Sequence, residues 1–112
     1  MMNLTLLASH EHQPPAEGDA RVVALANDAD ATALPLEGVE RVDLHFPNFT
    51  DGRAFSQAFL LRRRRGFAGE IRATGDVLID QLAQMQRTGF SSALLRECVD
   101  TADAQRQFEL FP

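Results

Sequence analysis

A repeated boundary between a helix and a strand constrains the fold of this chain more than any other feature. Gly66-Phe67 and Gly89-Phe90 each close a helical segment with a glycine and then begin an extended, apolar segment. Glycine commonly takes the left-handed conformation that ends a helix. Strands that alternate with helices in this way pair in parallel, because a parallel pair needs a long crossover rather than a tight turn. The spacing therefore predicts a β/α repeat.

The repeat divides the chain into four expected strands and two main helices. The strands are expected at residues 22–26, 41–46, 70–74 and 92–95, and the helices at 51–65 and 76–88, with shorter helices at 30–34 and 101–111. Right-handed crossovers place such helices against the sheet. We expect an α/β fold with a mainly parallel sheet of about four strands, either an open three-layer sheet or part of a β/α barrel.

The length of 112 residues allows one domain. Residues 10–20 are polar and contain Pro14, Pro15 and Gly18, a composition typical of a loop. We therefore expect residues 1–20 to form a flexible lead-in and residues 21–112 to form a single α/β domain.

Composition excludes several classes of function. A net charge of −5 argues against a general attraction to nucleic acid. The apolar run Leu4–Ala8 is too short for an export signal or a membrane span. The single cysteine, Cys98, cannot form an internal disulfide and suits a reducing compartment. These features predict a cytoplasmic protein without a membrane or nucleic-acid partner.

Two long motifs carry a resemblance to a known family. Residues 46–53 read FPNFTDGR, and residues 69–82 read GEIRATGDVLIDQL. In these motifs the chain resembles a bacterial family of unknown function whose members are generally called oxidoreductases associated with sulfite reduction. The resemblance covers about the central half of the chain. It implies a role in assimilatory sulfite or nitrite reduction.

Polar side chains at the ends of two expected strands suggest a binding site. Ligands of open α/β sheets bind beyond the carboxyl ends of the strands. Asp51 and Arg53 follow the second expected strand, Asp76 follows the third, and Gln81 lies in the helix after it. Arg72 lies within the third strand, where a buried guanidinium needs an acidic partner, either Asp51 or Asp76. These five residues are the candidate ligand-binding residues.

Each candidate also has a structural interpretation. Asp51 and Asp76 precede expected helices, where a carboxylate caps free amide groups. A pair formed by Arg72 would lock two loops together; alternatively, Arg72, Arg53 and the helix amino ends form an anion or carboxylate site. Gln81 is either part of that site or a side chain at the edge of an apolar stripe.

The sequence contains no recognisable cofactor motif. It has no Gly-Lys-Ser/Thr phosphate loop, no G-x-G-x-x-G fingerprint and no cluster of Cys and His. His10 and His12 lie in the polar lead-in, and His45 is expected to be packed within a strand. We therefore expect no cofactor and no metal site, and leave catalytic residues unassigned. Two functions stay open: an accessory or binding protein of sulfite reduction, and a small enzyme of the oxidoreductase type.

The expected helix at residues 51–65 has two further notable features. Residues 62–65 are four consecutive arginines, which point all round a helix and complement its negative end. This favours a solvated cap over a nucleic-acid site. Phe59 and Leu60 widen the apolar surface of the helix beyond what one sheet contact requires. They predict a protein partner in sulfite reduction or a homo-oligomer.

Overall fold

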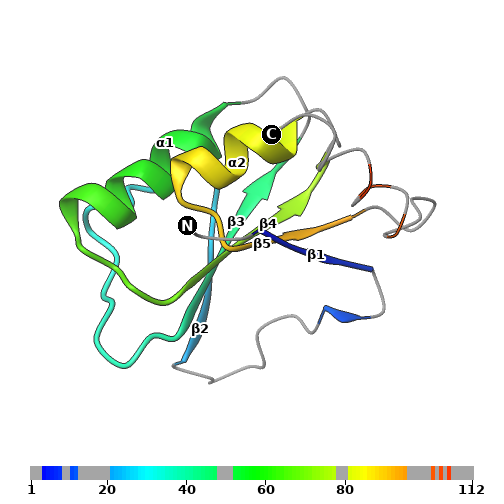
Figure 1. Cartoon of the computed structure of the whole chain (residues 1–112). Helices are drawn as coiled ribbons and strands as arrows, with labels where there is room; N and C mark the ends of the chain where they lie inside the picture. The colour runs from blue at the N-terminus through cyan, green and yellow to red at the C-terminus, as the bar shows by residue number, and fades with distance from the viewer. Residues whose placement is uncertain are drawn as a thin grey trace.

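The computed structural model describes residues 4–8, 11–12, 21–47, 52–77 and 81–95, together with Ala102, Ala104 and Arg106, which are helical. Five strands form one parallel sheet in the order β1-β5-β4-β3-β2 (Figure 1). They are β1 (Thr5–Leu7), β2 (Val22–Leu25), β3 (Arg41–Phe46), β4 (Glu70–Gly75) and β5 (Ser92–Leu94). The prediction of an α/β fold with an open, parallel sheet is confirmed.

Two helices end at the predicted glycines, although α2 begins later than the predicted start at residue 76. Helix α1 (Arg53–Phe59) continues into the π-helical turn η2 (Leu60–Arg64), and α2 (Leu82–Thr88) precedes β5. Gly66 and Gly89 have φ angles of 64° and 114°, in the left-handed region that favours glycine. Both predicted helix ends are therefore confirmed. Residues 30–34 form turns and bends instead of the short helix expected there.

Both described helices cover the same face of the sheet (Figure 1). Strands β2, β3, β4 and β5 are neighbours in chain order, so each right-handed crossover steps in the same direction. The crossovers from β3 to β4 and from β4 to β5 therefore bring α1 and α2 to the same side, which is the distribution found in a segment of a β/α barrel. Between the helices and the sheet lie the rings of Phe46, Phe55 and Phe90, with the Phe46 centroid 5.1 Å from Phe55 and 5.8 Å from Phe90.

Strand β1 corrects the expected start of the ordered domain. Thr5 donates its backbone N–H to the carbonyl of Ser91 at 2.9 Å, and Leu95 donates to the carbonyl of Leu7 at 2.8 Å. Leu4 is buried in the core. Residues 5–7 therefore belong to the sheet and Leu4 to the core, and the expectation that they form a flexible lead-in is wrong. A three-residue strand is too short to show a period in the sequence.

The other face of the sheet carries polar side chains from neighbouring strands. Successive residues of a strand point to opposite faces, so every second residue of each strand shares this face. The buried apolar positions on the helix side fix the alternate set on the other side, which neither α1 nor α2 covers and which we call the uncovered face. It presents Thr5, Arg41, Asp43, His45, Glu70, Arg72, Thr74 and Ser92. Among the described residues, no helix is long and apolar enough to cross a membrane.

Candidate functional site

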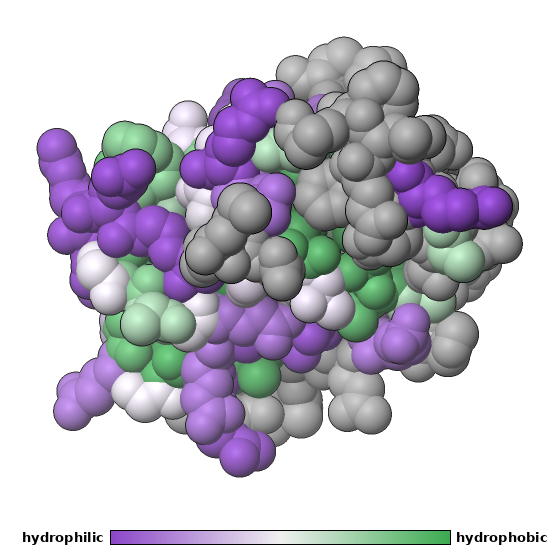
Figure 2. All heavy atoms as spheres, in the orientation of Figure 1, coloured by the Kyte–Doolittle hydropathy of each residue, from purple (hydrophilic) through white to green (hydrophobic). Residues whose placement is uncertain are grey.

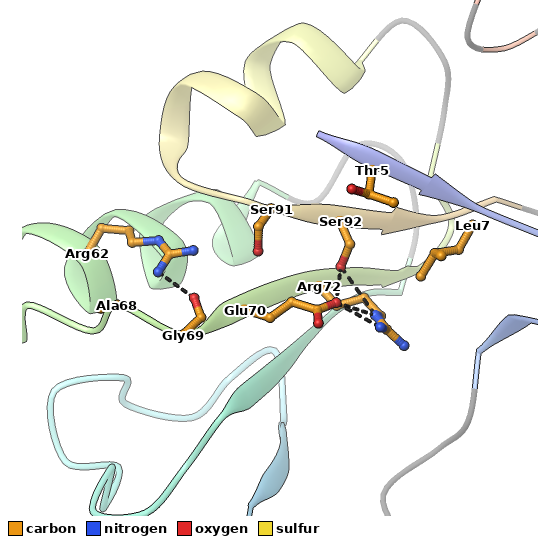
Figure 3. Close-up of a pocket in the computed structure, with 9 residues that line it drawn as sticks. All are labelled: Thr5, Leu7, Arg62, Ala68, Gly69, Glu70, Arg72, Ser91 and Ser92. Carbon is orange, nitrogen blue, oxygen red and sulfur yellow. Dashed lines mark hydrogen bonds and ion pairs between the residues drawn. The ribbon is translucent and has the colours of Figure 1, made fainter. Parts of the chain in front are cut away.

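A cavity of about 480 Å³ opens at the amino ends of three strands of the sheet. Thr5, Glu70 and Ser92 are the first residues of β1, β4 and β5, and all three line it (Figure 3). The remaining lining residues are Leu7, Arg62, Ala68, Gly69, Arg72 and Ser91. The cavity thus lies at the opposite end of the strands from the site expected from the sequence. We call it the arginine cavity.

Arg72 is held by Glu70 on its own strand. Its Nη2 lies 2.7 Å from Oε2 of Glu70, and its Nε donates to the same oxygen at 3.0 Å. Ser92, its register partner on β5, donates its hydroxyl to that oxygen at 2.6 Å (Figure 3). The expected pairing of Arg72 with Asp76 is therefore wrong, and Asp51 lies outside the described residues. Glu70 stands two positions earlier on the same face of the sheet, whereas Asp76 follows the end of the strand.

Glu70 is ionised at neutral pH. Partial burial acts to raise the pKa of its carboxyl group, but the hydrogen bonds from Ser92 and Arg72 and the charges of Arg72 and Arg41 outweigh it. The pKa of Glu70 therefore lies below its ordinary value of 4.5. The arginine cavity thus contains a fixed negative charge beside the Arg72 guanidinium.

Arg62 brings a second guanidinium to the arginine cavity. Its Nε donates to the carbonyl of Gly89 at 2.9 Å, and its Nη1 donates to those of Phe67 and Gly69 at 2.8 and 2.6 Å. Burial lowers the pKa of Arg62, but an arginine stays charged in proteins. Within the described parts of the chain no carboxylate pairs with Arg62, and no acceptor contacts its Nη2.

Only two of the four consecutive arginines at residues 62–65 form the expected solvated cap. Arg63 and Arg64 are exposed as expected, and hydrophilic side chains project from the surface around η2 in Figure 2. Arg62 and Arg65 instead bind backbone carbonyls, and Arg65 reaches those of Ala31 and Thr32. For these two residues the expectation is wrong. Four consecutive arginines point in all directions around a helix, so some must face the protein.

His12, in the connection between β1 and β2, contacts Arg72, one of the residues that line the arginine cavity. Its Nδ1 lies 2.9 Å from Nη1 of Arg72. A guanidinium can only donate, so Nδ1 accepts and the ring proton lies on Nε2. His12 is therefore neutral in this geometry. Nothing in the polar segment around His12 indicated this contact.

The pKa of His12 agrees with the neutral form. Burial lowers it below the ordinary value of 6.5. The charge of Asp43 raises it and that of Arg72 lowers it, with smaller opposing effects from Arg41 and Glu70. The net direction is downward, because removing an imidazolium from water disfavours its charged form.

A second cavity, of about 480 Å³, lies toward the carboxyl ends of the strands. His12, His45, Asn27 and Thr74 line it, together with Ala24, Leu25, Ala26 and Asp43. Asp43 is bound by Arg41 through both oxygens, at 2.8 and 3.0 Å, so its charge is compensated. His45 is exposed rather than packed as expected, because it points away from α1 and α2 near the carboxyl end of β3. We call this the histidine cavity.

Arg53 lies in neither of these cavities. It is exposed at the start of α1 and lines a third cavity, of about 390 Å³, with Ser56 and Gln57. Gln57, only 5% exposed, donates through Nε2 to the carbonyls of Ala26 and Ala29 at 2.9 and 3.0 Å. It ties α1 to the turn after β2, a role that sequence reasoning did not identify. Arg53 and Arg72 therefore do not share a site.

Asp76 and Gln81 stay at the carboxyl end of the sheet. Asp76 follows β4 and donates its backbone N–H to the carbonyl of Phe46 at 2.8 Å. The described α2 begins at Leu82, so Asp76 is not its capping residue, and Gln81 is half-buried immediately before it. The helix α1 is preceded by Gly52, one residue after Asp51. Of the four candidates that the structure describes, only Arg72 lines the arginine cavity.

The described residues contain no group of three or more His, Cys, Asp or Glu side chains placed to hold a metal ion. A family model described as "Bacterial protein of unknown function (DUF934)" matches residues 22–112. Neither the curated proteins nor the solved structures give a significant match to this chain.

Proposed function

The chain belongs to this bacterial family of unknown function, DUF934, and we propose that it binds a small oxyanion in the arginine cavity. The proposed role is that of an accessory or binding protein in assimilatory sulfite or nitrite reduction, in the cytoplasm. The resemblance carried by residues 46–53 and 69–82 supplies this setting, and both sulfite and nitrite are small oxyanions.

The state of Arg62 carries the proposal. A half-buried charge is costly unless it is compensated, and the three backbone carbonyls that bind Arg62 supply dipoles but no negative charge. Its Nη2 keeps two N–H groups for a ligand, and a guanidinium binds two oxygens of an oxyanion in parallel. Arg72 lines the same cavity with a second guanidinium. These groups support a site for a small anion.

Titration calorimetry with sodium sulfite and sodium nitrite tests the proposal. We expect Arg62→Gln to weaken binding at least about tenfold, equivalent to about 1.4 kcal/mol. Arg63→Gln removes the same charge from the next, exposed residue and should bind as the wild type does. Wild-type protein that binds neither anion at millimolar concentration, or equal losses in the two variants, would overturn it.

A second pair of variants separates binding from folding, because Arg62 also supports the backbone. Thr5 is exposed on the edge strand β1 and lines the arginine cavity. Thr5→Glu adds a negative charge there and should abolish anion binding, whereas Thr5→Gln has nearly the same shape and should retain it. Circular dichroism of both variants checks that each is folded.

A small enzyme of the oxidoreductase type is the second candidate function, and the histidine cavity supports it. The cavity lies at the carboxyl ends of the strands, where α/β folds bind their ligands. His12 offers an Nε2–H there, and His45 offers a second imidazole. A visible absorbance scan of the purified protein, with an assay of sulfite loss in the presence of a reduced dye, tests this candidate. Sulfite loss with a bound chromophore would favour the enzyme.

A protein partner or homo-oligomer through α1 is also proposed. Phe59 is 51% exposed, and among the described residues it is the large apolar side chain that the surface leaves open. Leu60 is half-buried against the core, so Phe59 is the main contact in this proposal. Light scattering of the wild type and of Phe59→Arg, with affinity capture from cells grown on sulfate, tests it. A monomer in both cases with no captured protein would contradict it.

A further inference from the structure

We infer that the arginine cavity takes singly charged oxyanions at neutral pH, and that His12, bound to Arg72, is the residue that sets this charge limit. The inference rests on the proposed function, because it names the class of anion that the same cavity binds. It is carried by the contact between His12 and Arg72 and by the charges that surround that contact.

The charges of the cavity favour one negative charge on the ligand. Arg62 and Arg72 are positive and Glu70 is negative, so the lining carries a net charge of +1. Arg41 and Asp43 form an ion pair beside them and add no net charge. A monoanion compensates this excess. A second negative charge would face the Glu70 carboxylate, and the described lining residues hold no further cation to balance it.

Neutral His12 accepts one of the hydrogen bonds that the Arg72 guanidinium can donate. Glu70 takes one N–H of Nη2 and the N–H of Nε, and His12 takes one N–H of Nη1. Each of the two terminal nitrogens of Arg72 therefore keeps one N–H for a ligand. While His12 is neutral, Arg72 has few donors left and the cavity gains no charge from the imidazole.

Protonation of His12 changes both the number of free N–H donors on Arg72 and the charge beside the cavity. The imidazolium has no acceptor at Nδ1 and repels the guanidinium 2.9 Å away, so it must leave Nη1 of Arg72. The charges of Arg72 and Glu70 on β4 and of Arg41 and Asp43 on β3 act on the ring, and His45 lines the histidine cavity together with it. The two carboxylates keep the charged ring nearby. The cavity then has a freed N–H, and the imidazolium beside Arg72 adds one positive charge to the +1 of the lining, which favours a dianion.

Ligand and proton must therefore bind together. If protonation of His12 strengthens dianion binding, a bound dianion must raise the proton affinity of His12 by the same factor. A monoanion has half the charge and gains less from the same protonation. The ratio of dianion to monoanion affinity should then depend on pH, and only through His12.

Nitrate and sulfate are the probes, because neither changes its charge over the range in which histidine titrates, whereas sulfite does. The dissociation constants of both anions are measured at constant ionic strength at about pH 8 and at about pH 5.5. We expect wild-type protein to prefer nitrate at the higher pH. On acidification sulfate affinity should rise about tenfold more than nitrate affinity.

Three variants make the result specific to His12. His12→Gln keeps a neutral acceptor for Arg72, so its sulfate-to-nitrate ratio should not change with pH. His12→Lys is permanently charged and should prefer sulfate already at the higher pH. Arg87→Gln, an exposed change in the last turn of α2, should retain the wild-type shift.

The outcomes separate the inference from the function on which it rests. Protein that binds neither probe nor sulfite at any pH contradicts the anion-binding function itself. Binding of both probes with a ratio that ignores pH, or that shifts equally in His12→Gln, leaves anion binding in place and overturns the role of His12.

Discussion

The Nε of Arg62 donates to the carbonyl oxygen of Gly89 at 2.9 Å, so one side chain joins the end of η2 to the turn after α2. Gly89 is suited to this contact for two reasons. Its φ of 114° is strained for other residues, and a Cβ there would lie 2.5 Å from Cγ of Arg62. Through Nη1 the same guanidinium also binds the carbonyl of Phe67. Arg62 therefore holds the two glycine–phenylalanine boundaries of the β/α repeat together.

Arg62→Met should destabilise the protein by about 1.5–3 kcal/mol, because three backbone carbonyls lose a charged donor and a half-buried site is left partly unsatisfied. Arg63→Met, at the next and exposed position, should change stability by less than about 0.5 kcal/mol. Urea denaturation of the two variants measures the difference. Equal midpoints would show that the Arg62 contacts add nothing to stability.

A double-mutant cycle checks the partner of Arg72. Removing one member of a partly buried pair leaves the other charge without a partner, so Arg72→Met should cost about 1–3 kcal/mol, between the values for exposed and buried pairs. Combined with Glu70→Gln, the loss should be less than additive by about 1 kcal/mol. With Asp76→Asn the two effects should add. Additivity with Glu70→Gln would contradict the pair.

Much of the fold could be predicted from the sequence because it depends on local signals. Gly66 and Gly89 ended their helices as expected, and the alternation in residues 41–46 marked β3. β1 was missed because its three residues show no period, and its pairing with β5 joins segments far apart in the chain. Only the register of the sheet reveals that Leu4 completes the core.

The candidate site was less predictable, for a physical reason. Arg72 was identified because a guanidinium in a buried strand is unusual, but its partner depends on which residues share a face of the sheet. Glu70 and Ser92 share that face with Arg72, whereas Arg53 lines a different cavity. His12 and Arg62 were missed because their contacts arise from tertiary packing, and neither carries a local signal.

Acid should destabilise the protein in two separate steps. The pKa of His12 is lowered below 6.5 in the folded protein. Between pH 6.5 and this lowered pKa, the unfolded chain binds more protons than the folded protein does. The free energy of unfolding therefore falls as pH falls through this range. Glu70 has a pKa lowered below 4.5, so its contribution is present above 4.5 and is lost as pH falls through the lowered pKa.

Urea midpoints over a series of pH values test both steps. His12→Gln should flatten the dependence below about 6.5 and leave the more acidic step intact. Glu70→Gln should lower stability at neutral pH and flatten the more acidic step. If His12→Gln has the same pH dependence as the wild type, the neutral, partly buried state of His12 is wrong.

The last prediction concerns β1, which adds the fifth strand to the sheet. Leu4 is 4% exposed, so Leu4→Ala should destabilise the protein by about 2–4 kcal/mol, from the lost burial and the cavity left behind. Leu7→Ala, at a half-buried position on the uncovered face, should cost less.

Deletion of residues 1–8 should have a larger effect than Leu4→Ala, because it also exposes the backbone of β5 as a new edge. The amide of Leu95 donates to the carbonyl of Leu7 at 2.8 Å and reports on this pairing directly. Its hydrogen exchange should accelerate in the deleted chain to a rate set by local opening rather than by global unfolding. Leu4→Ala keeps the strand, so the Leu95 amide should still exchange slowly, at a rate set by the global stability of this variant. Fast exchange of Leu95 in the intact protein would show that β1 and β5 do not pair in solution.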